Sequence, residues 1–261
     1  MNLDVKWHAG WPSAKHDPAP PIQVHSYDSR TFILRQNKSV HYEAPFMFLL
    51  LGTHTALLID TGATAEEEYF PLRDTVSTLI GDRRLQVVHT HAHGDHVAGD
   101  GQFTDVVAPT LDAVIEFFGF TDWPSNSATV DLGDRIVDAI PGPGHQESAV
   151  VFYDRQTGLL LTGDTLYPGR LYIFDWDAYV ATIDRLIAFC SVNPVTHVLG
   201  CHIEMTTTPG VDYPIRTTYH PSEPPLQLTV DHLRALRAAL DETAGAYGPH
   251  PYPDFIVQRM H

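Results

Sequence analysis

The chain has 261 residues, with 32 acidic against 16 basic side chains, which gives a net charge of −16 at pH 7. This length accommodates one large α/β domain with a substantial core. A nucleic-acid partner needs clustered Lys and Arg, whereas lysine occurs here only at Lys6, Lys15 and Lys38, so we expect no nucleic-acid partner.

The N-terminal half is expected to hold an irregular arm followed by a group of strands. Residues 1–21 are rich in Pro, His and Trp, and we expect them to precede a single domain over residues 22–261. Apolar and β-branched runs predict strands at 22–27, 31–36, 46–51, 55–60 and 85–88. A helix is predicted over 65–80, and Pro71 is expected to shorten or kink it.

The C-terminal half is expected to alternate strands and helices. The predicted strands are 105–108, 135–140, 148–153, 158–163 and 196–200, and the predicted helices are 110–118 and 176–190. The proline-rich segment 206–225 is expected to be a long irregular loop, followed by a helix over 229–243 with a leucine stripe on one face. Strands followed by helices in both halves predict two sheets with helices outside, a four-layer αβ/βα sandwich of the α/β class.

The sequence contains no apolar run that is long enough to cross a bilayer. Its first eight residues lack the basic-then-apolar order of a secretory signal. The two cysteines, Cys190 and Cys201, form no recognisable metal or redox motif and are expected to be reduced thiols. We therefore expect a cytoplasmic protein without membrane association, and no pattern indicates its oligomeric state.

The run His91-Ala92-His93-Gly94-Asp95-His96 concentrates four metal-binding side chains within a short stretch. Neighbouring residues of a regular helix or strand point in different directions, whereas a tight turn after the strand at 85–88 lets these side chains converge. Three imidazoles and one carboxylate suit Zn²⁺ or another borderline divalent metal. The alternative is a histidine-rich surface tract that binds metal adventitiously in a chain with 16 histidines.

Further candidate ligands follow other strand-like segments. His145 comes after a Pro/Gly loop, Asp164 after the strand at 158–163, and His202 after the strand at 196–200. Loops that follow strands are where an α/β framework forms its sites. Cys201 beside His202 is a weaker candidate ligand, because the zinc sphere is already filled. The sequence therefore predicts a metal site rather than an adventitious tract.

Together these residues resemble the metallo-β-lactamase superfamily over about residues 22–205. The resemblance implies that His91, His93 and His145 hold a first metal, that Asp95, His96 and His202 hold a second, and that Asp164 bridges both. The segment Leu57-Leu58-Ile59-Asp60-Thr61-Gly62 also resembles a signature of that family, in which the aspartate supports the metal loops. True β-lactamases of this class carry cysteine or serine where Asp164 stands, so the chain is more similar to the glyoxalase II and lactonase branch.

The resemblance implies a hydrolase with two zinc ions per chain, with iron or manganese as alternatives. A metal-bridging hydroxide would attack a small ester, lactone or thioester, and Asp95 and Asp164 would orient it or carry its proton. A mononuclear iron enzyme resembling persulfide dioxygenases, or a non-catalytic binding protein on the same fold, are the alternatives. Tyr167 is expected to donate a hydrogen bond to substrate, in a pocket also lined by Tyr42, Tyr172 and Tyr213.

Overall fold

Strand β3 (Phe46–Leu51) shows how the first sheet is built, because all six of its residues are apolar and buried. Successive side chains of a strand point to opposite faces. Accordingly Phe46, Phe48 and Leu50 join one hydrophobic cluster, whereas the intervening residues join another. A strand of this kind requires cover on both faces, so the sheet that contains it lies inside the molecule.

The computed structural model describes residues 2–261, and its first sheet has five strands in the order of the chain. They are β1 (Ile22–Asp28), β2 (Thr31–Gln36), β3, β4 (Thr55–Ile59) and β5 (Arg84–Val88). Neighbours are antiparallel except β4 and β5, which are parallel and joined through helix α1 (Leu72–Ile80). A parallel pair needs such a crossover.

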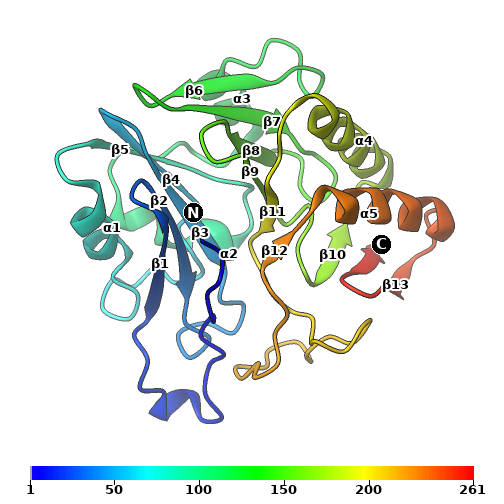
Figure 1. Ribbon diagram of the computed structural model, residues 1–261, viewed down its shortest axis with the longest axis horizontal. Coiled ribbons are helices and arrows are strands. Elements are labelled where there is room, and N and C mark those ends of the chain that lie inside the picture. Colours follow the sequence, from blue (N-terminus) through cyan, green and yellow to red (C-terminus); the bar gives the residue numbers. More distant parts are fainter. Residues whose placement is uncertain (1) are drawn as a thin grey trace.

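The second sheet has six strands in the order β12-β11-β9-β8-β7-β6. They are β6 (Ala128–Asp131), β7 (Ile136–Pro141), β8 (Val150–Asp154), β9 (Leu159–Gly163), β11 (His197–Gly200) and β12 (Gln227–Leu228). Helix α4 (Trp176–Val192) connects the parallel strands β9 and β11. Helix α5 (Val230–Thr243) follows β12 and packs beside α4 (Figure 1).

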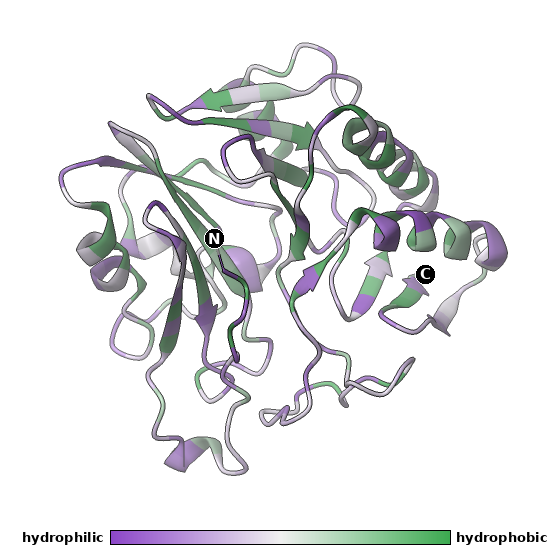
Figure 2. Ribbon diagram, viewed as in Figure 1, coloured by the Kyte–Doolittle hydropathy of each residue, from purple (hydrophilic) through white to green (hydrophobic). Residues whose placement is uncertain are grey.

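Three hydrophobic clusters correspond to the three interfaces of a four-layer structure. One lies between α1 and the first sheet, the second between the inner faces of the two sheets, and the third between the second sheet and the helices α4 and α5. In Figure 2 the apolar colour follows the central strands of both sheets, while the loops at the periphery are largely pale or purple. The predicted αβ/βα sandwich is therefore confirmed.

A small third sheet was not predicted. It comprises β10 (Arg170–Ile173), β14 (Ile256–Arg259) and β13 (Gly248–Pro251), in that order. Strand β13 contains Pro249 and Pro251, residues that normally argue against a strand. The parallel pairing of β10 with β14 joins segments far apart in the sequence, and no local pattern indicates it.

Several predicted boundaries differ from the structure. The helix expected over 65–80 begins only at Leu72, and Pro71 occupies its N-cap, since proline suits a helix start and not its interior. No strand forms at 105–108, where an isolated bridge joins Val106 to Val87. Helix α3 (Leu111–Phe118) follows as predicted. Among residues 2–261, no helix is both long and apolar enough to cross a membrane.

The N-terminal arm and the segment 206–225 are tied to the first sheet. Apart from a short 3-10 helix, η1 (Ala14–His16), the arm is irregular, and Trp7 packs its ring on Phe46 with centroids 4.8 Å apart. Segment 206–225 contains no helix or strand. It is fixed by Glu223, whose carboxylate accepts hydrogen bonds from both Nη atoms of Arg35 in β2, at 2.6 and 2.7 Å.

Candidate metal centre

The predicted ligands all follow strands whose ends meet at one edge of the sandwich. His91 and His93 lie in the loop after β5, and Asp95 and His96 lie in a one-turn helix, α2 (Gly94–Val97), which continues into a 3-10 helix, η2 (Ala98–Gln102). The other three ligands follow the second sheet: His145 after β7, Asp164 after β9 and His202 after β11. Strands β7, β9 and β11 share one direction, so their carboxyl ends lie together.

One detail of the predicted loop is different in the structure. A tight turn was expected to carry the whole run, but Asp95 and His96 begin a helical turn instead. Consecutive residues of a helix are rotated by about 100°. This rotation allows Asp95 to face the cavity while His96 reaches deeper, where its side chain is fully buried.

Three imidazoles converge as the first group, which comprises His91, His93 and His145. The Nε2 atom of His145 lies 3.3 Å from Nε2 of His91 and 3.0 Å from Nδ1 of His93. Burial is the main factor that lowers the pKa of His91 well below its usual range, and it also lowers the pKa of His145. Neutral imidazoles present lone pairs, as metal ligands must.

Two carboxylates and two imidazoles form the second group, which comprises Asp95, His96, Asp164 and His202. The Nε2 atoms of His96 and His202 are 3.3 Å apart, and Asp95 Oδ2 lies 3.2 and 3.1 Å from them. Burial disfavours a charged His202, but Asp164 and Asp95 outweigh it and raise its pKa to about 9. These carboxylates therefore attract positive charge to this position.

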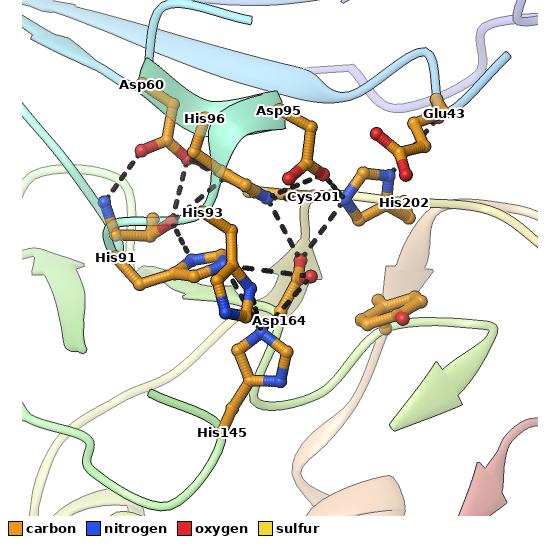
Figure 3. Close-up of polar contacts among 12 residues, drawn as sticks. Glu43, Asp60, His91, His93, Asp95, His96, His145, Asp164, Cys201 and His202 are labelled. Carbon is orange, nitrogen blue, oxygen red and sulfur yellow. Dashed lines mark hydrogen bonds and ion pairs between the residues drawn. The ribbon is translucent and has the colours of Figure 1, made fainter. Parts of the chain in front are cut away.

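Asp164 faces both groups (Figure 3). Its Oδ1 lies 3.3 Å from His202 Nε2 and 3.5 Å from His96 Nε2. Its Oδ2 lies 3.6 Å from His145 Nε2 and 3.9 Å from His91 Nε2. Oδ1 is buried and has no hydrogen-bond partner, which is costly unless a cation satisfies it.

The spacing of these donor atoms fits two metal ions. Ligands about 2.0–2.1 Å from a tetrahedral zinc ion stand about 3.3 Å from one another. The nitrogen–nitrogen and nitrogen–oxygen separations within each group cluster around that value. The donor set of imidazoles and carboxylates is also the one that zinc, iron and manganese accept.

Asp60 holds the loop that carries the ligands. Its carboxylate accepts hydrogen bonds from the backbone N–H of Thr90 at 2.7 Å, from Thr90 Oγ1 at 2.8 Å and from Nδ1 of His96 at 2.9 Å. With Nδ1 of His96 donating, its Nε2 is free to bind metal. Asp60 itself has a φ of 68°, a left-handed conformation that few non-glycine residues adopt and that is typical of functional sites.

Backbone carbonyls orient two further ligands. Nδ1 of His145 donates to the carbonyl of Tyr172 at 2.7 Å, and Nδ1 of His202 donates to the carbonyl of Glu43 at 3.2 Å. Cys201 Sγ lies 3.4 Å from Asp60 Oδ2, behind His96, and burial raises the pKa of its thiol. Cys201 thus contacts the supporting carboxylate.

A cavity of about 160 Å³ opens over the two groups. Besides five of the ligands it is lined by Glu43, Tyr167, Tyr172, Phe174 and Glu204. Of the four tyrosines expected there, Tyr42 and Tyr213 line a small neighbouring cavity instead. Sequence reasoning did not find Glu43, Phe174 or Glu204, because each is an isolated residue without a motif.

Tyr167 lies against the second group, but its hydroxyl has a partner of its own. The side chain is buried, its ring edge packs on His202 with centroids 5.3 Å apart, and its hydroxyl donates to the carbonyl of Arg170. The expected hydrogen bond to substrate would require the phenol to leave this acceptor. In the present geometry Tyr167 positions His202.

Comparisons with known proteins agree with this geometry. The family model described as "Metallo-beta-lactamase superfamily" matches residues 43–240. The chain is 27% identical over 202 residues to acyl-coenzyme A thioesterase MBLAC2 from Homo sapiens, and this alignment covers 60% of this chain and 72% of that protein. It is 30% identical over 145 residues to hydroxyacylglutathione hydrolase from Rhizobium meliloti (strain 1021), and this alignment covers 49% of this chain and 54% of that protein.

Solved structures show the same fold at lower identity. A metallo-beta-lactamase from Pontibacter korlensis superimposes with a TM-score of 0.60 at 20% identity, over 84% of this chain and 99% of that one. This likeness supports the shared sandwich architecture. Because the family model spans most of the sequence, from Glu43 to Leu240, this chain belongs to the metallo-beta-lactamase superfamily.

Proposed function

We propose that the protein is a hydrolase with two zinc ions per chain that cleaves a small ester, lactone or thioester, with a thioester favoured. The observation that carries the proposal is the placement of Asp164, whose two carboxylate oxygens face the first and the second group separately. One carboxylate shared in this way suits a dinuclear site better than a mononuclear one.

The seven candidate ligands would hold the two ions, and two of them would also handle the proton of the attacking water. His91, His93 and His145 would hold one ion, Asp95, His96 and His202 the other, and Asp164 both. When bound, two divalent ions supply an ionised water near neutral pH and polarise the scissile carbonyl. Asp95 and Asp164 would accept a hydrogen bond from the attacking water and pass its proton to the leaving group.

The thioester preference is supported by the relatives. Acyl-coenzyme A thioesterase and hydroxyacylglutathione hydrolase are both named for removing an acyl group from a thiol carrier. The cavity of about 160 Å³ would also have to accommodate the metal ions, so the remaining space suits a small acyl group. Ester and lactone bonds present the same carbonyl chemistry and remain within the proposal.

Metal analysis combined with hydrolysis assays tests the proposal. We expect two zinc ions per chain and metal-dependent release of thiol from a short-chain thioester. Asp164→Asn, which is nearly isosteric, should lower hydrolysis by at least about 100-fold, because the amide has no negative charge and replaces one of the two oxygens by an NH2 group that cannot bind a cation. Asp112→Asn, an exposed residue in α3, is the matched control.

Three results would contradict the proposal. Undiminished turnover in fully metallated Asp164→Asn would remove the shared carboxylate from the mechanism. One iron per chain with oxygen consumption would indicate a persulfide-dioxygenase-like enzyme. Two bound metals without turnover of any ester, lactone or thioester would indicate a binding protein.

A further inference from the structure

The cavity over the metal groups has two chemically different ends. Its walls other than the ligands are two carboxylates, Glu43 and Glu204, and three aromatic rings, Tyr167, Tyr172 and Phe174. No lysine or arginine lines this cavity. The arrangement of these residues along the cavity indicates which part of a substrate each end receives.

Phe174 forms the apolar end, beside the first group, whereas Tyr167 lies against His202 of the second group. Phe174 is 56% exposed, and its ring centroid lies 6.1 Å from that of His93 and 5.9 Å from that of His145. Its backbone N–H donates to the carbonyl of Gly144 at 3.0 Å, which fixes the ring against the loop that carries His145. An exposed phenylalanine at the mouth of a cavity offers apolar surface to a ligand.

The acidic end lies beside the second group. Figure 3 shows Glu43 next to His202, on the side of the site away from His145. The hydroxyl of Tyr42 donates to Glu43 Oε1 at 2.8 Å, His41 Nδ1 lies 3.6 Å from Oε2, and the side chain remains 32% exposed. Glu43 is therefore an oriented carboxylate in contact with both solvent and the cavity.

Most cations near this end are already paired. Arg170 lies 3.3 Å from Glu204 and 2.5 Å from Asp212, and the buried Lys38 lies 3.5 Å from Glu223. Arg216 is exposed and lines the small cavity that adjoins Glu43. The positive charge of Arg216 is opposed by the nearby carboxylate of Glu43 and by the net charge of −16 on the whole chain.

From this polarity we propose that Glu43 selects substrates in which a small apolar acyl group is attached to a neutral or cationic thiol. The acyl group contacts Phe174, and the carrier extends past Glu43, whose carboxylate attracts an ammonium group and repels phosphates or carboxylates. The inference rests on the proposed thioester hydrolysis and departs from the anionic carriers in the relatives' names.

Four butyryl thioesters test the inference on the zinc-loaded protein: those of thiocholine, N-acetylcysteamine, glutathione and coenzyme A. We expect kcat/KM to be at least about tenfold higher for the thiocholine and N-acetylcysteamine thioesters than for the coenzyme A thioester at low salt. The gap should narrow as ionic strength rises, because salt screens exposed charges. An equal or higher kcat/KM for the coenzyme A thioester would overturn the inference.

Two variants separate Glu43 from the charge of the whole protein. Glu43→Gln should lower the ratio of thiocholine to coenzyme A hydrolysis at least about fivefold. Glu116→Gln, an exposed residue in α3, removes the same charge elsewhere and should leave the ratio within about twofold. Equal changes in both variants would refute a local role for Glu43. A coenzyme A preference that is lost in Arg216→Ala would assign carrier recognition to Arg216 instead.

Binding of the corresponding S-butyl thioethers distinguishes this inference from the proposed function. These analogues cannot be hydrolysed, so calorimetry reports recognition whether or not the protein is a hydrolase. We expect S-butyl thiocholine to bind more tightly than S-butyl coenzyme A, with the difference reduced in Glu43→Gln. Tighter binding of the coenzyme A analogue to the unmodified protein would overturn the inference even if all four thioesters were hydrolysed.

Discussion

Replacing Glu223 by glutamine tests how the proline-rich segment is held to the first sheet. Glu223 has only 7% of its side chain exposed and accepts two hydrogen bonds from Arg35. Lys38 Nζ and His220 Nδ1 lie 3.5 and 3.1 Å from the same carboxylate. Glu223→Gln keeps the volume and removes the negative charge that pairs with Arg35 and lies near Lys38.

The pKa of Glu223 sets the expected magnitude. Burial acts to raise this pKa, but the charge and hydrogen bonds of Arg35 outweigh it and hold the pKa at about 2 instead of 4.5. That difference corresponds to about 3 kcal/mol of stability at pH 7. This value is similar to the loss of about 3–5 kcal/mol in folding stability that follows when one partner of a buried ion pair is removed.

The sign of the pH dependence follows from the same shift. Because the folded state lowers the pKa, the unfolded chain binds the proton more tightly, and the stabilisation is present above about pH 4.5 and lost as the pH falls toward 2. The deficit of Glu223→Gln should therefore shrink from about 3 kcal/mol at pH 7 to about 1 kcal/mol at pH 3.

Urea denaturation of the metal-free protein at both pH values measures this deficit without interference from metal loss. Glu68→Gln, an exposed residue, should change stability by less than about 0.5 kcal/mol. Lys38→Met in the Glu223→Gln background should recover part of the loss, because it removes a buried amine that has lost its carboxylate partner. A deficit below about 1 kcal/mol at pH 7, or one that is the same at pH 7 and pH 3, would refute the reasoning.

Three further outcomes are expected. Tyr167→Phe should lower the free energy of unfolding by about 1–1.5 kcal/mol in thermal denaturation, and Tyr172→Phe should lower it less. A fall of 100-fold or more in kcat with an unchanged Tm would instead show that the phenol serves catalysis, since each factor of ten in rate corresponds to about 1.4 kcal/mol of activation free energy. Gly144→Ala should destabilise by about 1–3 kcal/mol or more, because Gly144 has a φ of +134° and an added Cβ would lie 2.4 Å from Cα of Tyr179; a wild-type Tm would contradict this. Cephalosporins and carbapenems should be hydrolysed with kcat/KM below about 10⁴ M⁻¹s⁻¹, and a higher steady-state value would show that the substrate class is wrong.

The sequence was informative where residues recur in patterns. The apolar runs of β3 and β9 identify buried strands, and metal-binding side chains directly after strands indicate a common edge. The structure brings all seven predicted ligands into two adjoining groups. The strand and helix periodicities of both halves were sufficient to predict the order of layers.

Other features depend on contacts that no local pattern encodes. The ion pair between Arg35 and Glu223 joins residues 188 positions apart. Phe174 and Glu43 become cavity walls only because their loops bond to Gly144 and His202. The three-stranded sheet depends in the same way on tertiary packing, which overrides the weak strand preference of its sequence.

The order of strands in the first sheet also matters while the ribosome is making the chain. Its five strands are consecutive, so this sheet is able to form before the second half exists. His202 lies 106 residues after His96, a distance that takes about 5–20 s to translate. At the start of that interval the nascent chain presents four of its seven predicted metal ligands and the uncovered inner face of β3. We therefore expect the partly synthesised chain to expose apolar surface and an incomplete set of metal ligands until residue 202 has been translated.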